Sequence, residues 1–61
     1  MAIQHDKPLF TPQEVAEILQ LNVLTIYSYI RKKDLVAVRM GRNYRITKKD
    51  LAKFIESNKT Y

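Results

Sequence analysis

Apolar residues recur every three or four positions in three stretches of the chain, and at every second position in a fourth stretch. Recurrence at three to four positions predicts an amphipathic helix, whereas recurrence at two predicts a half-buried strand. In the first stretch, TPQEVAEILQ, Val15, Ile18 and Leu19 share one helical face. The β-like stretch lies between the second and third helical stretches. The predicted order is therefore helix, helix, two-stranded hairpin, helix.

The first two helices carry clear start signals. Thr11 is placed to act as an N-cap, with Pro12 at the first helical position and Glu14 completing a capping box. Asn22 is the N-cap of the second helix and stands only a few residues beyond the end of the first. Two short helices with so brief a connection have the spacing of a helix-turn-helix.

The second helix, predicted over residues 23–33, has a narrow apolar stripe. Ile26 and Ile30 are one turn apart, and Val23 and Tyr29 flank them. The residues that point away from this stripe, or lie on its borders, are Leu24, Thr25, Tyr27, Ser28, Arg31 and Lys32. This helix therefore presents a mixed polar, aromatic and basic surface.

The hairpin is predicted from LVAVRM and NYRI, which flank Gly41. Glycine suits the first position of a two-residue turn, but alternation favours a three-residue loop, Gly41 to Asn43. The longer loop pairs Val38 with Ile46, Met40 with Tyr44, and Arg39 with Arg45. One face of the hairpin would then be apolar and the other basic. A two-stranded hairpin is not stable alone in water, so we expect Tyr44 to dock on the helices.

The third helix begins with a second capping pattern, Thr47 followed by Asp50. Its apolar face comprises Leu51, Phe54 and Ile55. These elements predict one domain over residues 9–56, an N-terminal tail over 1–8 and a C-terminal tail over 57–61.

The charge of the chain is concentrated in one segment. Eleven basic and six acidic residues give a net charge of +5. The segment from Arg31 to Lys49 holds eight basic residues and one acid, a local net charge of +7. A surface adapted only for solubility would intersperse both signs, so this block predicts a surface that faces a polyanion.

Several classes of protein are disfavoured by composition. The chain has no cysteine, and its single histidine, His5, lies in the predicted tail. Disulfides and a metal centre are therefore not expected, nor is any cofactor. The sequence has no paired carboxylates, no nucleophile–base pair and no phosphate-binding glycine loop, so it does not predict an enzyme. With no apolar run of membrane-spanning length, we expect a cytoplasmic, nucleoid-associated protein.

Residues 9–55 resemble the excisionase-type winged helix-turn-helix, a small relative of the MerR DNA-binding domain. The resemblance rests on TPQEVAEIL with Ala16 at the helix crossing, on TIY, on LVAVRMGRNYRI and on KKDLAKFI. It implies a mainly α fold with a two-stranded β-hairpin, ordered as helix-turn-helix, hairpin wing and helix. The chain departs from the family at Lys33, where glycine is usual, and at Ser28, where a basic residue is common.

The resemblance also implies double-stranded DNA as the partner. The second helix would enter the major groove through the outward residues Leu24, Thr25, Tyr27, Ser28, Arg31 and Lys32. The wing, about residues 36–46, would meet phosphates or the minor groove through Arg39, Arg42, Asn43 and Arg45. Proteins of this family often bind direct repeats cooperatively and bend DNA for an integrase or recombinase, or regulate transcription.

Two other functions are compatible with the same residues. The basic surface could meet an acidic protein such as an integrase, with exposed Leu24 and Tyr27 in the contact and no direct DNA readout. RNA binding is a third hypothesis, but it usually requires exposed aromatic rings, and Tyr29 and Tyr44 are predicted to pack in the core.

Overall fold

All three helices start at the residues that the capping patterns predict. The computed structural model describes residues 8–60, so the predictions for residues 1–7, including His5, and for Tyr61 lie outside the described residues. The helices are α1 (Pro12–Leu19), α2 (Val23–Arg31) and α3 (Lys48–Ser57). The N–H of Glu14 donates to Thr11 Oγ1 at 3.0 Å, and the N–H of Thr11 donates to Glu14 Oε1 at 2.8 Å. This reciprocal pair satisfies two backbone donors at the start of α1.

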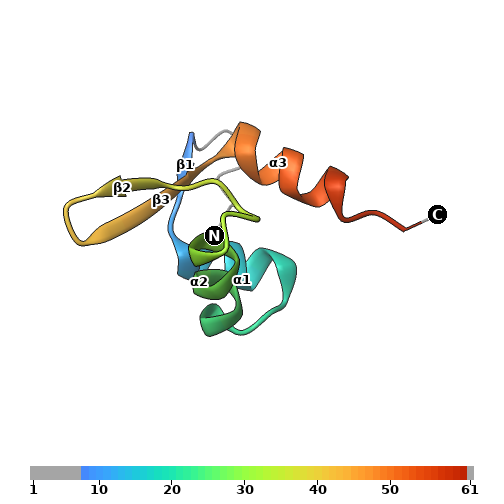
Figure 1. Cartoon of the computed structure of the whole chain (residues 1–61), viewed down its shortest axis with the longest axis horizontal. Helices are drawn as coiled ribbons and strands as arrows, with labels where there is room; N and C mark the ends of the chain where they lie inside the picture. The colour runs from blue at the N-terminus through green and yellow to red at the C-terminus, as the bar shows by residue number, and fades with distance from the viewer. Residues whose placement is uncertain (1–7, 61) are drawn as a thin grey trace, which may run out of the picture.

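The connection between α1 and α2 is short and is fixed by backbone bonds. Gln20 takes a left-handed conformation with φ of 57°, and the N–H of Leu21 donates to the carbonyl of Ala16 at 2.8 Å. The side chain of Asn22 then accepts from the N–H of Leu24 at 2.8 Å, which caps α2. The two helices pack side by side on one side of the molecule (Figure 1).

The second helix is shorter than predicted. It ends at Arg31 instead of Lys33, because Lys32 is its C-cap and Lys33 takes a positive φ of 64°. A residue in the left-handed region cannot continue a right-handed helix. The chain therefore turns towards the hairpin two residues earlier than expected.

The sheet has three strands where the sequence predicts two. The strands are β1 (Leu9–Phe10), β2 (Val38–Met40) and β3 (Asn43–Thr47), in the antiparallel order β1-β3-β2. Phe10 pairs with Ile46, which anchors β3 between the other two strands. A strand of two residues has no alternation to detect, so β1 gives no periodic signal in the sequence.

The predicted register of the hairpin is wrong. The observed pairs are Val38 with Arg45, Arg39 with Tyr44, and Met40 with Asn43. The loop thus contains two residues, Gly41 and Arg42, and φ is positive at Gly41 alone, at 63°. Glycine in the first central position, with ordinary φ in the second, matches a type II′ turn. Asn43 does not take the left-handed conformation that the three-residue loop assigns to it.

Alternation misleads here because the hairpin extends beyond the helices (Figure 1). A Cβ added at Gly41 would meet no atom within 4 Å, so the turn lies in open space. Neither face of the hairpin tip is buried, and burial of one face is what makes alternation specify a register. The register is set instead by the turn, which requires a residue with positive φ at its first central position, Gly41.

The core joins one or two residues from almost every element. It consists of Phe10, Val15, Ala16, Ile26, Leu35, Ile46, Leu51 and Phe54. Two residues predicted for apolar helical faces are largely exposed instead: Ile18 at 48% and Ile55 at 40%. Both lie on the edge of the apolar stripes of their helices. Among residues 8–60, no helix has the length and apolarity needed to cross a membrane.

Candidate nucleic-acid interface

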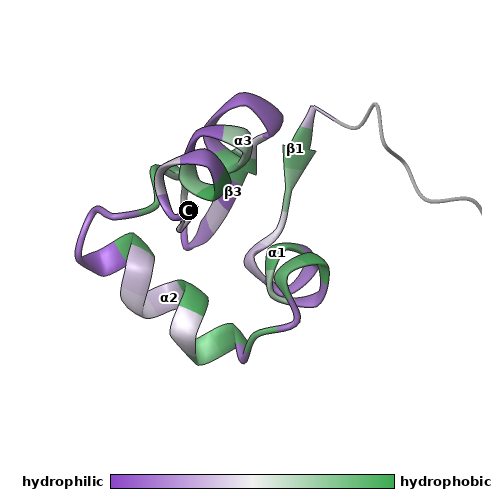
Figure 2. Ribbon diagram, turned by 90° about the vertical axis from the view of Figure 1, so that its right-hand side faces the viewer, coloured by the Kyte–Doolittle hydropathy of each residue, from purple (hydrophilic) through white to green (hydrophobic). Residues whose placement is uncertain are grey.

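The outward surface of α2 is accessible along its length. Leu24 is 70% exposed and Arg31 is exposed, while Ser28, one turn from each, is half-buried. Thr25 and Tyr27 are half-buried, as expected for residues on the border of the apolar stripe. In Figure 2 this helix runs from a hydrophobic first turn to a hydrophilic end at the linker. A helix with such a surface has the size and the side chains to lie in the major groove of DNA.

Tyr27 connects α2 to both neighbouring elements. Its ring packs against that of Tyr44 in β3, with centroids 6.3 Å apart and planes tilted by 60°. Gln13 Nε2 of α1 donates to the Tyr27 hydroxyl at 3.5 Å. Tyr44 is half-buried, so its predicted docking on the helices takes the form of this ring contact. The contact fixes the hairpin relative to α2.

The register distributes the hairpin arginines over both faces. Arg39 is paired with Tyr44 and therefore lies on the face that contacts α2. Arg45 is paired with Val38 on the other face, where its Nη1 donates to the carbonyl of Tyr44 at 2.8 Å. Arg42 is exposed at the turn, and Arg39 Nε donates to the carbonyl of Gly41 at 3.1 Å. The prediction that Arg39 and Arg45 share one face is thus wrong.

The basic side chains of this region have no acidic partner in the part of the chain that the structure describes. Within residues 8–60, none of the eight basic residues from Arg31 to Lys49 forms a salt bridge. All of them are exposed except Arg45, which is half-buried. Guanidinium groups carry forked donors that match phosphate oxygens, so this surface is suited to a phosphate backbone.

A hollow of about 430 Å³ lies where the end of α2, the link to the hairpin and Tyr44 of β3 meet. Leu35 and Tyr44 contribute to its apolar walls, and Arg31 and Lys33 also line it. Lys33 is absent from the predicted contact residues, although it belongs to the basic run that begins at Arg31. Its position beside Arg31 depends on how the chain turns after α2, which periodicity does not specify.

Comparison with known protein families gives one match, which covers residues 9–59 and is described as a helix-turn-helix domain. The chain belongs to this family. Within the helix-turn-helix domain, α1 and α2 are the paired helices, and β2 and β3 form the hairpin that follows them. The fold is thus a mainly helical winged helix-turn-helix, as the sequence predicts, with one strand more than expected.

Relatives of this helix-turn-helix domain occur in two bacteria. One is "Uncharacterized protein YvgK" of Bacillus subtilis (strain 168), 40% identical over 45 residues, which covers 74% of this chain and 15% of that protein. Another is "Putative DNA-binding protein Rv0500A" of Mycobacterium tuberculosis (strain ATCC 25618 / H37Rv), 32% identical over 50 residues. That match covers 82% of this chain and 64% of the relative. No solved structure matches the chain.

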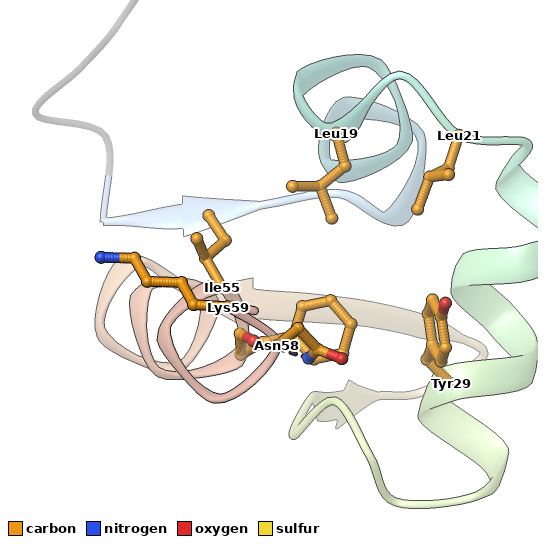
Figure 3. A pocket seen from close by; sticks show the side chains of 7 residues that line it. Leu19, Leu21, Tyr29, Ile55, Asn58 and Lys59 are labelled. Carbon is orange, nitrogen blue, oxygen red and sulfur yellow. Dashed lines mark hydrogen bonds between the residues drawn. The ribbon is translucent and has the colours of Figure 1, made fainter. Parts of the chain in front are cut away.

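The helix-turn-helix domain has a second hollow, which differs in chemistry from the one beside the hairpin. It measures about 360 Å³ and lies between the C-terminal ends of α1 and α3 and the side of α2 (Figure 3). Its walls are mainly apolar and include Leu19, Leu21 and Tyr29. Its single lysine, Lys59, pairs with Glu56 at 3.2 Å. This hollow has no free cation, so we place the candidate interface on α2 and the hairpin.

The described part of this surface holds no cluster of metal-ligating side chains. Within residues 8–60, no three acidic, histidine or cysteine side chains are close enough to hold a metal ion. No buried side-chain nitrogen or oxygen lacks a hydrogen bond in the same range. The surface offers cationic, hydrogen-bonding and, at Leu24, apolar side chains.

Proposed function

We propose that this chain binds double-stranded DNA, with α2 in the major groove and the β2–β3 hairpin against the flanking backbone. The observation that carries the proposal is the combination of exposed Leu24 and Arg31 on α2 with a block of cations that have no acidic partner within residues 8–60. Two further facts support it: the chain belongs to the helix-turn-helix family, and one relative bears the name "Putative DNA-binding protein Rv0500A".

The side chains suggest a division of roles. Arg31 can donate to a guanine edge, Leu24 can contact a thymine methyl, and Thr25 and Ser28 can donate to a base or a phosphate. Tyr27 and Lys32 flank these positions and are proposed to contact the backbone. In the wing, Arg39 and Arg42 lie on the α2 side and at the tip, so we assign them the main phosphate contacts, with Asn43 and Arg45 secondary.

For the biological role, we favour an excisionase-like architectural factor or a small transcriptional regulator of a mobile element. The resemblance of residues 9–55 to excisionase-type domains supports this assignment. An integrase or recombinase is then the expected protein partner, with cooperative self-association on repeated sites.

Fluorescence anisotropy with the DNA of the adjacent attachment or promoter region tests the proposal. We expect binding at about 150 mM salt to be at least 10³-fold tighter than to random duplex, with affinity falling steeply as salt rises. Four to six phosphate contacts predict a log–log slope of about −4 to −5. Equal affinity for both duplexes would contradict sequence-specific binding.

A protein-interaction module is the second candidate function, and the 70% exposure of Leu24 is the observation that favours it. An apolar residue of a partner protein could contact this leucine as well as a thymine methyl of DNA could. Co-purification with an integrase that survives nuclease treatment, together with no anisotropy change on DNA, would support this alternative.

The position of Arg31 yields a prediction on specificity. Replacing Arg31 with alanine should relax the preference at one base pair by about 1–3 kcal/mol, because a bidentate contact to guanine is lost. The measurement is a competition series with single-base variants of the site. If affinity falls equally for every variant, Arg31 contacts a phosphate instead of a base.

A further inference from the structure

The link between α2 and the hairpin contains a lysine in a backbone conformation that favours glycine. Lys33 has φ of 64°, whereas its neighbour Lys32 has φ of −80°. For a residue with a Cβ, the left-handed region is unfavourable, and such strain persists only where surrounding interactions enforce it.

Those interactions are present on both sides of Lys33. Its own N–H donates to the carbonyl of Ile30 at 3.0 Å. The N–H groups of Asp34 and Leu35 both donate to the carbonyl of Tyr29, at 2.9 and 3.2 Å. Leu35 is 1% exposed and belongs to the core, so the chain cannot leave this path without removing Leu35 from its site. The backbone of Lys33 is therefore fixed, and its side chain starts from a fixed point.

Lys33 is one of the residues that line the hollow beside the hairpin. Lys33 and Arg31 both line this hollow, with Tyr44 on its β3 side. Lys33 is exposed and forms no ion pair within residues 8–60. Lys33 lies between the helix and the wing, next to Arg31, and is placed to receive a phosphate where a DNA backbone would pass from one element to the other.

We propose that Lys33 is a phosphate-contacting residue at the junction of α2 and the wing, held there at a cost to folding stability. The proposal rests on the DNA-binding function proposed above and adds a contact that the helix periodicity does not predict. An ammonium group is a point charge without directional preference, so its contribution is independent of DNA sequence.

The test compares Lys33→Gln with the matched variant Lys53→Gln, which removes the same charge from the exposed side of α3. At about 150 mM salt, Lys33→Gln should weaken binding to specific and random duplex by the same factor, about fivefold, and reduce the log–log salt slope by about one. Lys53→Gln should change neither value appreciably, and Lys33→Arg should retain wild-type affinity and slope.

Thermal unfolding supplies a second readout. Lys33→Gly should raise Tm by about 3–6 °C, because glycine relieves the left-handed strain, yet bind DNA as weakly as Lys33→Gln. Lys32→Gly should lower Tm. Lys32 has an ordinary φ, so glycine relieves no strain there and only increases the conformational entropy of the unfolded chain. If Lys33→Gln binds DNA like Lys53→Gln, the phosphate contact is overturned. If the wild-type chain binds no DNA, the proposed function itself fails.

Discussion

Replacing Ile26 with alanine is expected to lower the free energy of unfolding by about 3 kcal/mol, within the range of 2–4 kcal/mol for a fully buried isoleucine. Ile26 is 0% exposed and lies in α2 within the core. A domain of 61 residues has about 3–9 kcal/mol of stability in total. The variant should therefore lose about a third or more of its stability, and at the lower end of this range about half of the molecules would be unfolded at 25 °C. Urea denaturation followed by circular dichroism measures the loss.

Leu24→Ala is the matched control, since it removes an apolar side chain of the same size from the same helix. Leu24 is 70% exposed, so this change should alter the free energy of unfolding by less than about 0.5 kcal/mol. Ile30 is half-buried and should give an intermediate loss. Equal losses at Ile26 and Leu24 would contradict the burial of α2 along a narrow stripe.

The double replacement Arg39→Ala/Arg42→Ala is expected to weaken DNA binding about 30-fold at 150 mM salt. Each phosphate contact contributes about 0.9 to the log–log salt slope, which corresponds to about fivefold in affinity at this concentration. The slope should fall by about two units. Both residues are exposed, so Tm should change little, and anisotropy titrations over a range of salt concentrations measure the effect.

Arg45→Ala provides the comparison for the face of the hairpin. Arg39 and Arg45 are the same residue type on adjacent strands, but they lie on opposite faces. We therefore expect Arg39→Ala alone to weaken binding more than Arg45→Ala. The reverse order would mean that DNA approaches the outer face of the wing, which carries Val38 and Met40.

The capping residues show which parts of the fold can be predicted from the sequence. Thr11, Asn22 and Thr47 each accept a hydrogen bond from a backbone N–H two or three residues ahead, as predicted. These contacts are local, so residue type and spacing specify them without reference to the remaining structure. The same holds for Ile26, whose burial follows from helical periodicity.

The candidate site was predictable only in part. The exposure of Leu24 and Arg31 follows from the position of α2 residues around the helix axis. The division of the arginines between the two hairpin faces, and the presence of Lys33 at the hollow, do not. Both depend on the backbone at two turns, one at Lys33 and one at Gly41. A change of φ at one residue, or a shift of the register by one residue, changes the direction of the side chains that follow.

Sequence alone therefore determines the order of helices and hairpin, the start points of the helices and the concentration of positive charge, because each is set by contacts within about one turn or by composition. Only the tertiary structure decides the register of β2 on β3, the addition of β1 and the direction of Arg39, Arg45 and Lys33. The physical reason is that these features depend on which surfaces are buried. At the projecting hairpin tip neither face is buried, so Gly41 sets the turn and the alternation of side chains does not.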